Sequence, residues 1–294
     1  MPINKQIQNL QKLQGVNQPL RPVGIWRAPT ALENEYVRFQ VSFMRGVEDE
    51  VKKIIIPQIS TWMQESKLDA LDEDLDSIIN SMKKQFDKQI DSNRTSTIVL
   101  ANQIDGFNAR EWTRILKRVA GVSWFNYEPW REKKIASWVH ENTRLIKTIK
   151  NKALDDTEHL IRDGILQGKR VETIKREIVG IGELKKTDKN PYSATKSAFT
   201  KAKNNAERIA VDQVGKLNSK LTENRQVDLG INKYIWRNMQ DRRVRGNPIG
   251  LYPNSKYNHW SREGKMYSWD SPPADGHPGY PIRCRCFAEP VFED

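Results

Sequence analysis

The amino-acid sequence predicts a mainly α-helical protein, with an elongated helical N-terminal body and a small α+β cap domain at its C-terminal end. Apolar residues recur at helical spacing through most of the first 230 residues, which is the pattern of amphipathic helices. Only 37% of the 294 residues are hydrophobic, whereas 29% are charged, and this composition favours an elongated helical body over one compact globule. Beyond residue 230, prolines and glycines gather together with both cysteines, which is typical of a small, turn-rich domain.

The first two segments differ in periodicity. Residues 1–29 combine prolines with Gln and Asn and show little periodicity, so they predict an extended arm that becomes ordered only against a partner. Residues 30–130 are expected to form a helical N-terminal region. Its first helix begins near Ala31, and Pro57 is expected to break or kink it, because proline lacks the backbone N–H that a helix interior needs.

Three further helices are expected in this region. One runs over residues 60–68, and the next begins with the acidic residues of 69–76, which suit the positive end of a helix dipole. Asp105-Gly106 predicts a turn. Asn108, with Glu111 three residues later, then predicts the N-cap of a new helix.

Residues 131–229 are expected to form a long-helix region that leads into the cap. Gly121 ends the preceding helix, because glycine readily adopts the left-handed conformation of a helix C-terminus. The elements expected next are a long helix, a short helix, a loop and a second long helix, over residues 130–165, 171–180, 180–193 and 194–228.

Residues 230–294 are expected to form the compact α+β cap. Residues 232–239 predict a strand that places Tyr234 and Trp236 on one face and Ile235 on the other. The prolines and glycines that follow predict tight turns.

The charge of the chain predicts a polyanion or an acidic protein surface as partner, and the alternative is a basic surface that only keeps the protein soluble. The chain carries 49 Lys and Arg against 37 Asp and Glu, a net charge of +12, and the excess is dispersed through mixed-sign helices. This distribution favours sequence-independent contact with the phosphates of double-stranded DNA over base recognition. The candidate DNA contacts lie on the helical body and are Lys117, Arg118, Lys133, Lys134, Lys147, Lys150 and Lys152.

No apolar run approaches the roughly 20 residues that span a bilayer, and the N-terminal residues lack the apolar core of a signal peptide. We therefore expect a soluble protein made in a cytoplasm, with no membrane partner. Cys284 and Cys286 are separated by one residue, a spacing that rarely closes a relaxed disulfide, so a reducing compartment fits.

The polar residues of the cap allow three interpretations. In the catalytic interpretation, His259 is a general base oriented by Asp241, or Cys284 is a nucleophile that a histidine activates. The sequence contains no nucleophile elbow, phosphate loop or HExxH helix that would support catalysis. In the second interpretation, four soft ligands bind zinc, namely Cys284, Cys286, His277 and His259.

The third interpretation is structural, and it is the one we favour. The alternation in "IRCRCF" places both thiols on one face of a final strand, as small buried residues, with Arg283 and Arg285 on the other face. Asp241 and Arg243 are expected to form a buried ion pair that orients the His259 imidazole. The spacing of the thiols also disfavours zinc, because structural zinc sites usually have two to four residues between paired cysteines.

Four strings in order near the C-terminal end resemble the phage Mu F-like minor head, or head morphogenesis, domain. They are "YIWRNMQDRRVR", "HWSREG", a proline-rich segment and "IRCRCFAEP". The resemblance covers roughly residues 140–294, and it marks as framework residues of the cap Trp236, Asp241, Arg243, Arg245, His259, Gly264, Cys284, Arg285 and Cys286. Two departures are a long spacer over residues 245–259 and Val211-Asp212 where relatives often have Thr-Glu.

The resemblance implies a non-catalytic minor head protein of a tailed phage, with no cofactor. Such a protein is made in the host cytoplasm and incorporated near the portal vertex, inside the procapsid and capsid. Its implied partners are the portal protein, the major capsid protein or a scaffold, and its implied role is in head assembly and in DNA packaging or ejection. Two alternatives are a toxin-like or nucleotide-modifying enzyme domain and a basic DNA-binding protein that acts outside a virion.

Overall fold

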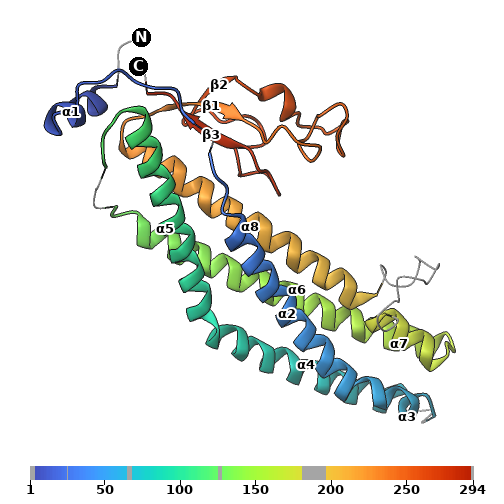
Figure 1. Ribbon diagram of the computed structural model, residues 1–294. Coiled ribbons are helices and arrows are strands. Elements are labelled where there is room, and N and C mark those ends of the chain that lie inside the picture. Colours follow the sequence, from blue (N-terminus) through green and yellow to red (C-terminus); the bar gives the residue numbers. More distant parts are fainter. Residues whose placement is uncertain (1–3, 25, 65–67, 125–127, 181–196, 293–294) are drawn as a thin grey trace. The chain divides into compact units, whose positions relative to one another are not determined.

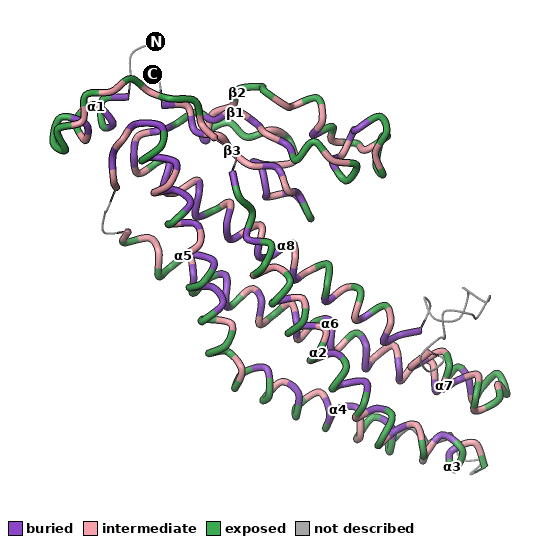
Figure 2. Tube along the Cα trace, in the orientation of Figure 1, coloured by how far each residue is buried: buried purple, intermediate pink, exposed green. Residues whose placement is uncertain are grey.

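Helices make up most of the chain, and a small antiparallel sheet lies near its C-terminal end (Figure 1). The computed structural model describes residues 4–24, 26–64, 68–124, 128–180 and 197–292. The predicted class, mainly α with a small α+β cap, is confirmed. Buried and exposed positions alternate along the helices (Figure 2), as expected for amphipathic helices.

The N-terminal segment is not an extended arm throughout, because it contains helix α1, Lys5–Leu13. Asn4 caps this helix: its Oδ1 accepts hydrogen bonds from the backbone N–H of Gln6 at 2.9 Å and of Ile7 at 3.4 Å. Ile7 is fully buried in an apolar cluster with Leu116 and Phe292. The described part of the segment therefore packs within the chain itself, which corrects the expectation that it orders only against a partner.

The next four elements follow the sequence pattern closely. They are α2, Thr30–Ile54; the 3-10 helix η1, Ile56–Gln58; α3, Ile59–Gln64; and α4, Leu68–Ser92. Pro57 lies in the first turn of η1. The backbone N–H groups of a first turn have no acceptor within the helix, so the N–H that proline lacks is not needed there. The predicted break after α2 is thus confirmed.

Helix α5, Arg94–Val119, contains the clearest error of the sequence-based prediction. It runs without interruption through Asp105 and Gly106, where a turn was expected, and Asn108 is buried inside the helix instead of capping it. Gly121 does follow the end of the helix, and its φ of 73° is left-handed as predicted.

Three helices precede the cap: α6, Arg131–Leu166; α7, Val171–Val179; and α8, Ala198–Asp228. Both long helices and the short one between them were predicted. Helices α6 and α7 pack closely at Gly164, where an added Cβ would lie 2.5 Å from Cγ1 of Ile174. The loop predicted over residues 180–193 lies outside the described residues, apart from Gly180.

The chain forms two compact units, and each is assembled from separate segments. Unit 1 contains Met1–Asn34, Val99–Trp138 and Val211–Asp294, and unit 2 contains Glu35–Ile98 and Val139–Ala210. The four consecutive segments expected from the sequence do not coincide with these units, because each unit joins segments that are separate in the chain. Unit 2 has its own core, in which α2 and α4 contribute Val47, Val51, Leu75, Ile79 and Phe86.

The cap belongs to unit 1 and is built on a three-stranded antiparallel sheet. Strand β1, Lys233–Arg237, lies between β2, Met266–Ser268, and β3, Phe287–Pro290. Tyr234 and Trp236 are both fully buried on one face of β1, as predicted. Trp236 pairs with Ala288 of β3 in the register of the sheet. A short 3-10 helix, η2, Trp260–Arg262, precedes β2.

Candidate metal centre in the C-terminal cap

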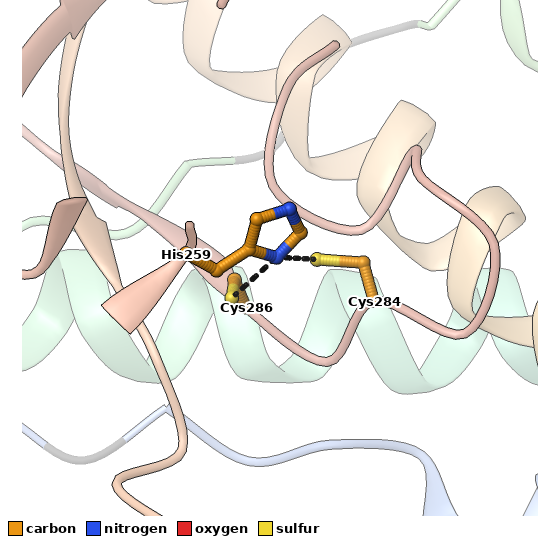
Figure 3. Close-up of side chains that lie close together, drawn as sticks. All are labelled: His259, Cys284 and Cys286. Atoms are coloured by element: carbon orange, nitrogen blue, oxygen red, sulfur yellow. Dashed lines mark hydrogen bonds between the residues drawn. The ribbon is translucent and has the colours of Figure 1, made fainter. Parts of the chain in front are cut away.

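One imidazole and two thiols converge in the cap (Figure 3). His259 Nδ1 lies 3.5 Å from the Sγ atom of Cys284 and 3.6 Å from that of Cys286. His259, Cys284 and Cys286 are 2%, 8% and 6% exposed, respectively, and their three ligand atoms lie within 4.8 Å of one another. We call these three residues the thiol–imidazole cluster.

Backbone geometry aims both thiols at the same nitrogen. Arg283 has a left-handed φ of 55°, and the N–H of Cys284 donates to the carbonyl of Pro281 at 2.8 Å in a tight turn. Strand β3 begins only at Phe287, so the two cysteines precede the strand on which the sequence placed them. They are buried, as the structural interpretation expected, but they face a histidine and do not only pack against apolar side chains.

The carboxylate that orients His259 belongs to Asp275 and not to Asp241. Asp275 Oδ2 lies 2.8 Å from His259 Nε2, and Asp275 Oδ1 forms an ion pair with Arg262 Nη1 at 2.6 Å. The Arg262 guanidinium in turn lies 4.8 Å from the ring centre of Trp236. No sequence pattern singles out Asp275, because its surroundings, "PPADGHP", are equally typical of an ordinary turn.

The pKa values of the two thiols are shifted in opposite directions. Burial would raise the pKa of Cys284, but hydrogen bonds with Cys286 and His259, together with the charge of His259, lower it well below its usual range. Burial would lower the pKa of His259, but Cys284 and Asp275 raise it. The pKa of Cys286 is raised well above its usual range by Cys284 and by burial. Cys284 is therefore the thiol that ionises first.

Asp241 and Arg243 form no buried ion pair. Arg243 Nε lies 3.8 Å from Asp241, and the side chain of Arg243 is 63% exposed. Arg285 is the closer partner of Asp241. Burial would raise the pKa of Asp241, but the hydrogen bonds from Arg285 and from the Arg243 backbone N–H lower it. Asp241 and Arg243 support a surface turn of the cap, and Arg285, which lies between the two cysteines in the chain, pairs with that turn.

The remaining framework residues hold turns together. Arg245 Nη2 donates to the carbonyl of Ile282 at 2.5 Å, next to the turn that carries Cys284. Gly264 has a left-handed φ of 74°, and its N–H donates to the carbonyl of Trp236 at 2.9 Å. Both contacts link loops of the cap to the sheet or to the cysteine segment.

His277 is not part of the cluster, which corrects the four-ligand version of the zinc hypothesis. Its Nδ1 lies 2.9 Å from the hydroxyl of Tyr234, and its ring packs 4.8 Å from that of Trp269. Burial lowers the pKa of His277. His277 is therefore a buried residue that packs against Tyr234 of β1.

The candidate DNA contacts differ in their accessibility. Lys150 is fully buried, and its Nζ donates to Asp87 Oδ1 at 2.8 Å and to the carbonyl of Lys83 at 2.9 Å; it cannot reach a phosphate. Lys147 is paired with Asp91 at 2.9 Å, and Lys152 with Asp156 at 3.0 Å. The other candidates have exposed or half-exposed side chains and are Lys117, Arg118, Lys133 and Lys134.

The sequence also failed to indicate a buried polar network in unit 1. Arg225 of α8 is 3% exposed in its side chain, and it forms ion pairs with Asp105 at 2.7 Å and Glu128 at 2.8 Å. Its Nη1 donates to Asn108 Oδ1 at 2.5 Å. The Asn108 amide donates in turn to Thr222 of α8 at 2.8 Å. These contacts explain why α5 continues through the polar positions where a turn was expected.

The fold and the site together define a helical protein whose small α+β cap encloses buried thiols and an imidazole. Residues 155–289, from within α6 to within β3, match the family model described as Phage Mu protein F like protein. The resemblance inferred from the strings of the cap is therefore confirmed for the C-terminal region, and every framework residue lies in the matched segment. The match supports a bacteriophage head-related protein.

Comparison with curated proteins gives one relative without an assigned role. An uncharacterized protein of Haemophilus influenzae is 27% identical over 263 residues, which cover 86% of this chain and 51% of the relative. The chain thus spans about half the length of that protein. No solved structure matches the chain. Among the described helices, none is long and apolar enough to cross a membrane.

Proposed function

We propose that this chain is a minor head protein of a tailed phage, incorporated near the portal vertex on the inside of the procapsid. In this role it acts in head assembly and in DNA packaging or ejection, and it contacts DNA without reading sequence. The observation that carries the proposal is the family match over residues 155–289. The portal or shell proteins are the proposed protein partners.

The geometry of the cap supports a non-catalytic role. Both nitrogens of His259 are engaged, Nδ1 by the two sulfurs and Nε2 by Asp275, so neither is available to take a proton from a substrate. A general base has to come within hydrogen-bond distance of the proton that it removes. The sulfur of Cys284, which would be the nucleophile, belongs to a residue that is only 8% exposed.

Exposed cations on the helices support the proposed DNA contact. Lys117, Arg118 and Lys133 form no ion pair with another described residue, and their side chains are exposed. From Gly106 to Arg176 the chain has 16 Lys and Arg against 9 Asp and Glu, whereas from Ile231 to Asp294 it has 10 against 7. We therefore assign most of the DNA affinity to the helices and not to the cap.

The test of DNA contact removes equal charge from the two places in the full-length chain. One variant carries Lys117→Ala, Lys133→Ala and Lys134→Ala, and the matched control carries three exposed cap lysines changed to alanine, Lys233, Lys256 and Lys265. Binding to a duplex of arbitrary sequence is measured by fluorescence anisotropy over a range of salt concentrations. Each lost phosphate contact reduces the slope of log K against log salt by about 0.9.

The helix variant is expected to bind more weakly and with a shallower salt slope than the cap variant. Equal losses in both variants, or binding that does not respond to salt, would contradict the assignment. A chain truncated at Asp228 is unsuitable, because Ile231 and Phe292 belong to the same apolar cluster as Ile7 and Trp112. Truncation would open that cluster and confuse loss of fold with loss of contact.

The portal association is tested separately by co-expressing the full-length chain with the portal protein encoded by the same phage. We expect the two proteins to co-purify after a wash in high salt, because screening weakens exposed electrostatic contacts far more than a packed interface. Co-purification that disappears after nuclease treatment would instead indicate that DNA bridges the two proteins, and the portal contact would then be rejected.

A further inference from the structure

We propose that the thiol–imidazole cluster is a zinc site with three protein ligands, His259 Nδ1, Cys284 Sγ and Cys286 Sγ, which staples the cap. This inference is independent of the proposed role in the phage head. It differs from the sequence-based zinc hypothesis in its ligand set, because His277 is excluded, and it replaces the purely structural interpretation of the two thiols.

The two nitrogen-to-sulfur distances match those of a tetrahedral site. Zinc binds histidine nitrogen at about 2.0–2.1 Å and cysteine sulfur at about 2.3 Å, so tetrahedral geometry separates the nitrogen from each sulfur by about 3.5 Å. The two observed distances from His259 Nδ1 are 3.5 Å to Cys284 and 3.6 Å to Cys286. A cation at the common centre of the three atoms would therefore need little rearrangement.

The surroundings of the cluster have the features of an outer shell around a metal. A ligating histidine usually donates its second ring N–H to a carboxylate, which fixes the tautomer and directs the other nitrogen at the metal. Asp275 occupies this position, 2.8 Å from His259 Nε2, and Arg262 holds Asp275 in place. The backbone N–H of Gly279 donates to Cys284 Sγ at 3.3 Å, a contact that stabilises a thiolate ligand.

A divalent cation would leave the charges around the cluster balanced. Two thiolates and one Zn²⁺ have no net charge, and Asp275 is neutralised by Arg262, whose side chain is 12% exposed. Burying an unbalanced charge is strongly unfavourable. A zinc-loaded cluster would therefore be neutral as a whole, which is compatible with the burial of all three ligands.

The fourth coordination position is left to a water molecule. No fourth His, Cys, Asp or Glu among the residues that the structure describes joins the group. Three protein ligands with an open position are usual in catalytic zinc sites, but the burial of all three side chains favours a structural role here. The apolar cluster of the cap is small, so the free energy of metal binding would add directly to the stability of its fold.

Elemental analysis of the full-length protein, purified without a polyhistidine tag and without added metal, tests the proposal. We expect about one zinc ion per chain. The matched variants are His259→Gln and His277→Gln, which make the same substitution at two buried histidines of the cap. The first is expected to lose most of the zinc, and the second to retain it.

Cobalt substitution keeps the test valid if a variant does not fold. Wild-type protein stripped of metal by a chelator is titrated with Co²⁺, which we expect to give intense visible bands of tetrahedral coordination and a thiolate-to-cobalt charge-transfer band in the near ultraviolet. Cys286→Ser should weaken the charge-transfer band. Absence of both zinc and the cobalt bands in folded wild-type protein would overturn the proposal, as would loss of zinc in His277→Gln but not in His259→Gln.

Discussion

At the scale of single residues, the cap shows how local spacing can suggest the wrong pair. An Asp-x-Arg step places both side chains on one face only if the chain is extended. Here Gln240 has a left-handed φ of 52°, and the N–H of Val244 donates to the carbonyl of Asp241 at 3.1 Å. The segment is therefore a turn, and Arg243 is directed to the solvent. His259 receives its carboxylate from Asp275, which lies 16 residues away in the sequence.

Replacing Asp275 with asparagine is expected to destabilise the cap, because the change removes the charge that Arg262 and His259 share. Loss of one partner of a buried ion pair costs about 3–5 kcal/mol. Denaturant unfolding, followed by the fluorescence of the cap tryptophans, measures the change. The matched control is Asp270→Asn, since Asp270 is exposed; equal effects of the two substitutions would contradict this account.

Arg243→Ala serves as a comparison in the same experiment. The sequence-based hypothesis of a buried pair predicted a large loss of stability. The structure instead predicts a loss of no more than about 1 kcal/mol, because exposed ion pairs contribute little. The side chain of Arg243 is 63% exposed.

At the scale of elements, apolar periodicity predicted most helices but could not assign polar positions. The long stripes of α6 and α8, and the stops at Pro57 and Gly121, were all readable in the sequence. Asn108, with Glu111 three residues later, fits a helix N-cap and a buried helical position equally well. Only its tertiary partners on α8, among them Arg225 and Thr222, distinguish the two. Helix α1 was missed because its few apolar residues are stabilised by contacts distant in the sequence.

Replacing Arg225 with methionine is expected to destabilise unit 1 by about 3–5 kcal/mol, since Glu128 would lose its buried counter-ion and Asp105 would keep only its ion pair with the half-exposed Arg131. The matched control is Lys220→Met on the same helix, where the side chain is exposed and the expected change lies within about 0.5 kcal/mol. Chemical denaturation of both full-length variants provides the comparison. A loss below about 1 kcal/mol for Arg225→Met would show that the network is not structurally important.

At the scale of the whole molecule, the sequence predicted many of the buried apolar residues but not against what they pack. Each unit joins segments that are far apart in the chain, whereas the sequence-based boundaries followed the chain in order. The apolar residues of the N-terminal segment and Phe292 meet in one cluster, and no local pattern encodes such a contact. Lys150 illustrates the same limit, because its buried pairing with Asp87 cannot be inferred from its position in a basic helix.

The proposed function requires this chain to be present in phage heads, and that presence can be measured directly. Quantitative mass spectrometry of purified procapsids and virions, from a phage whose genome encodes the chain, is the most direct test. The proposal predicts a few copies per particle in both preparations, retained after nuclease treatment and a wash in high salt. Absence of the chain from both preparations, while it is abundant in the lysate, would contradict the proposal and favour a DNA-binding protein that acts outside the virion.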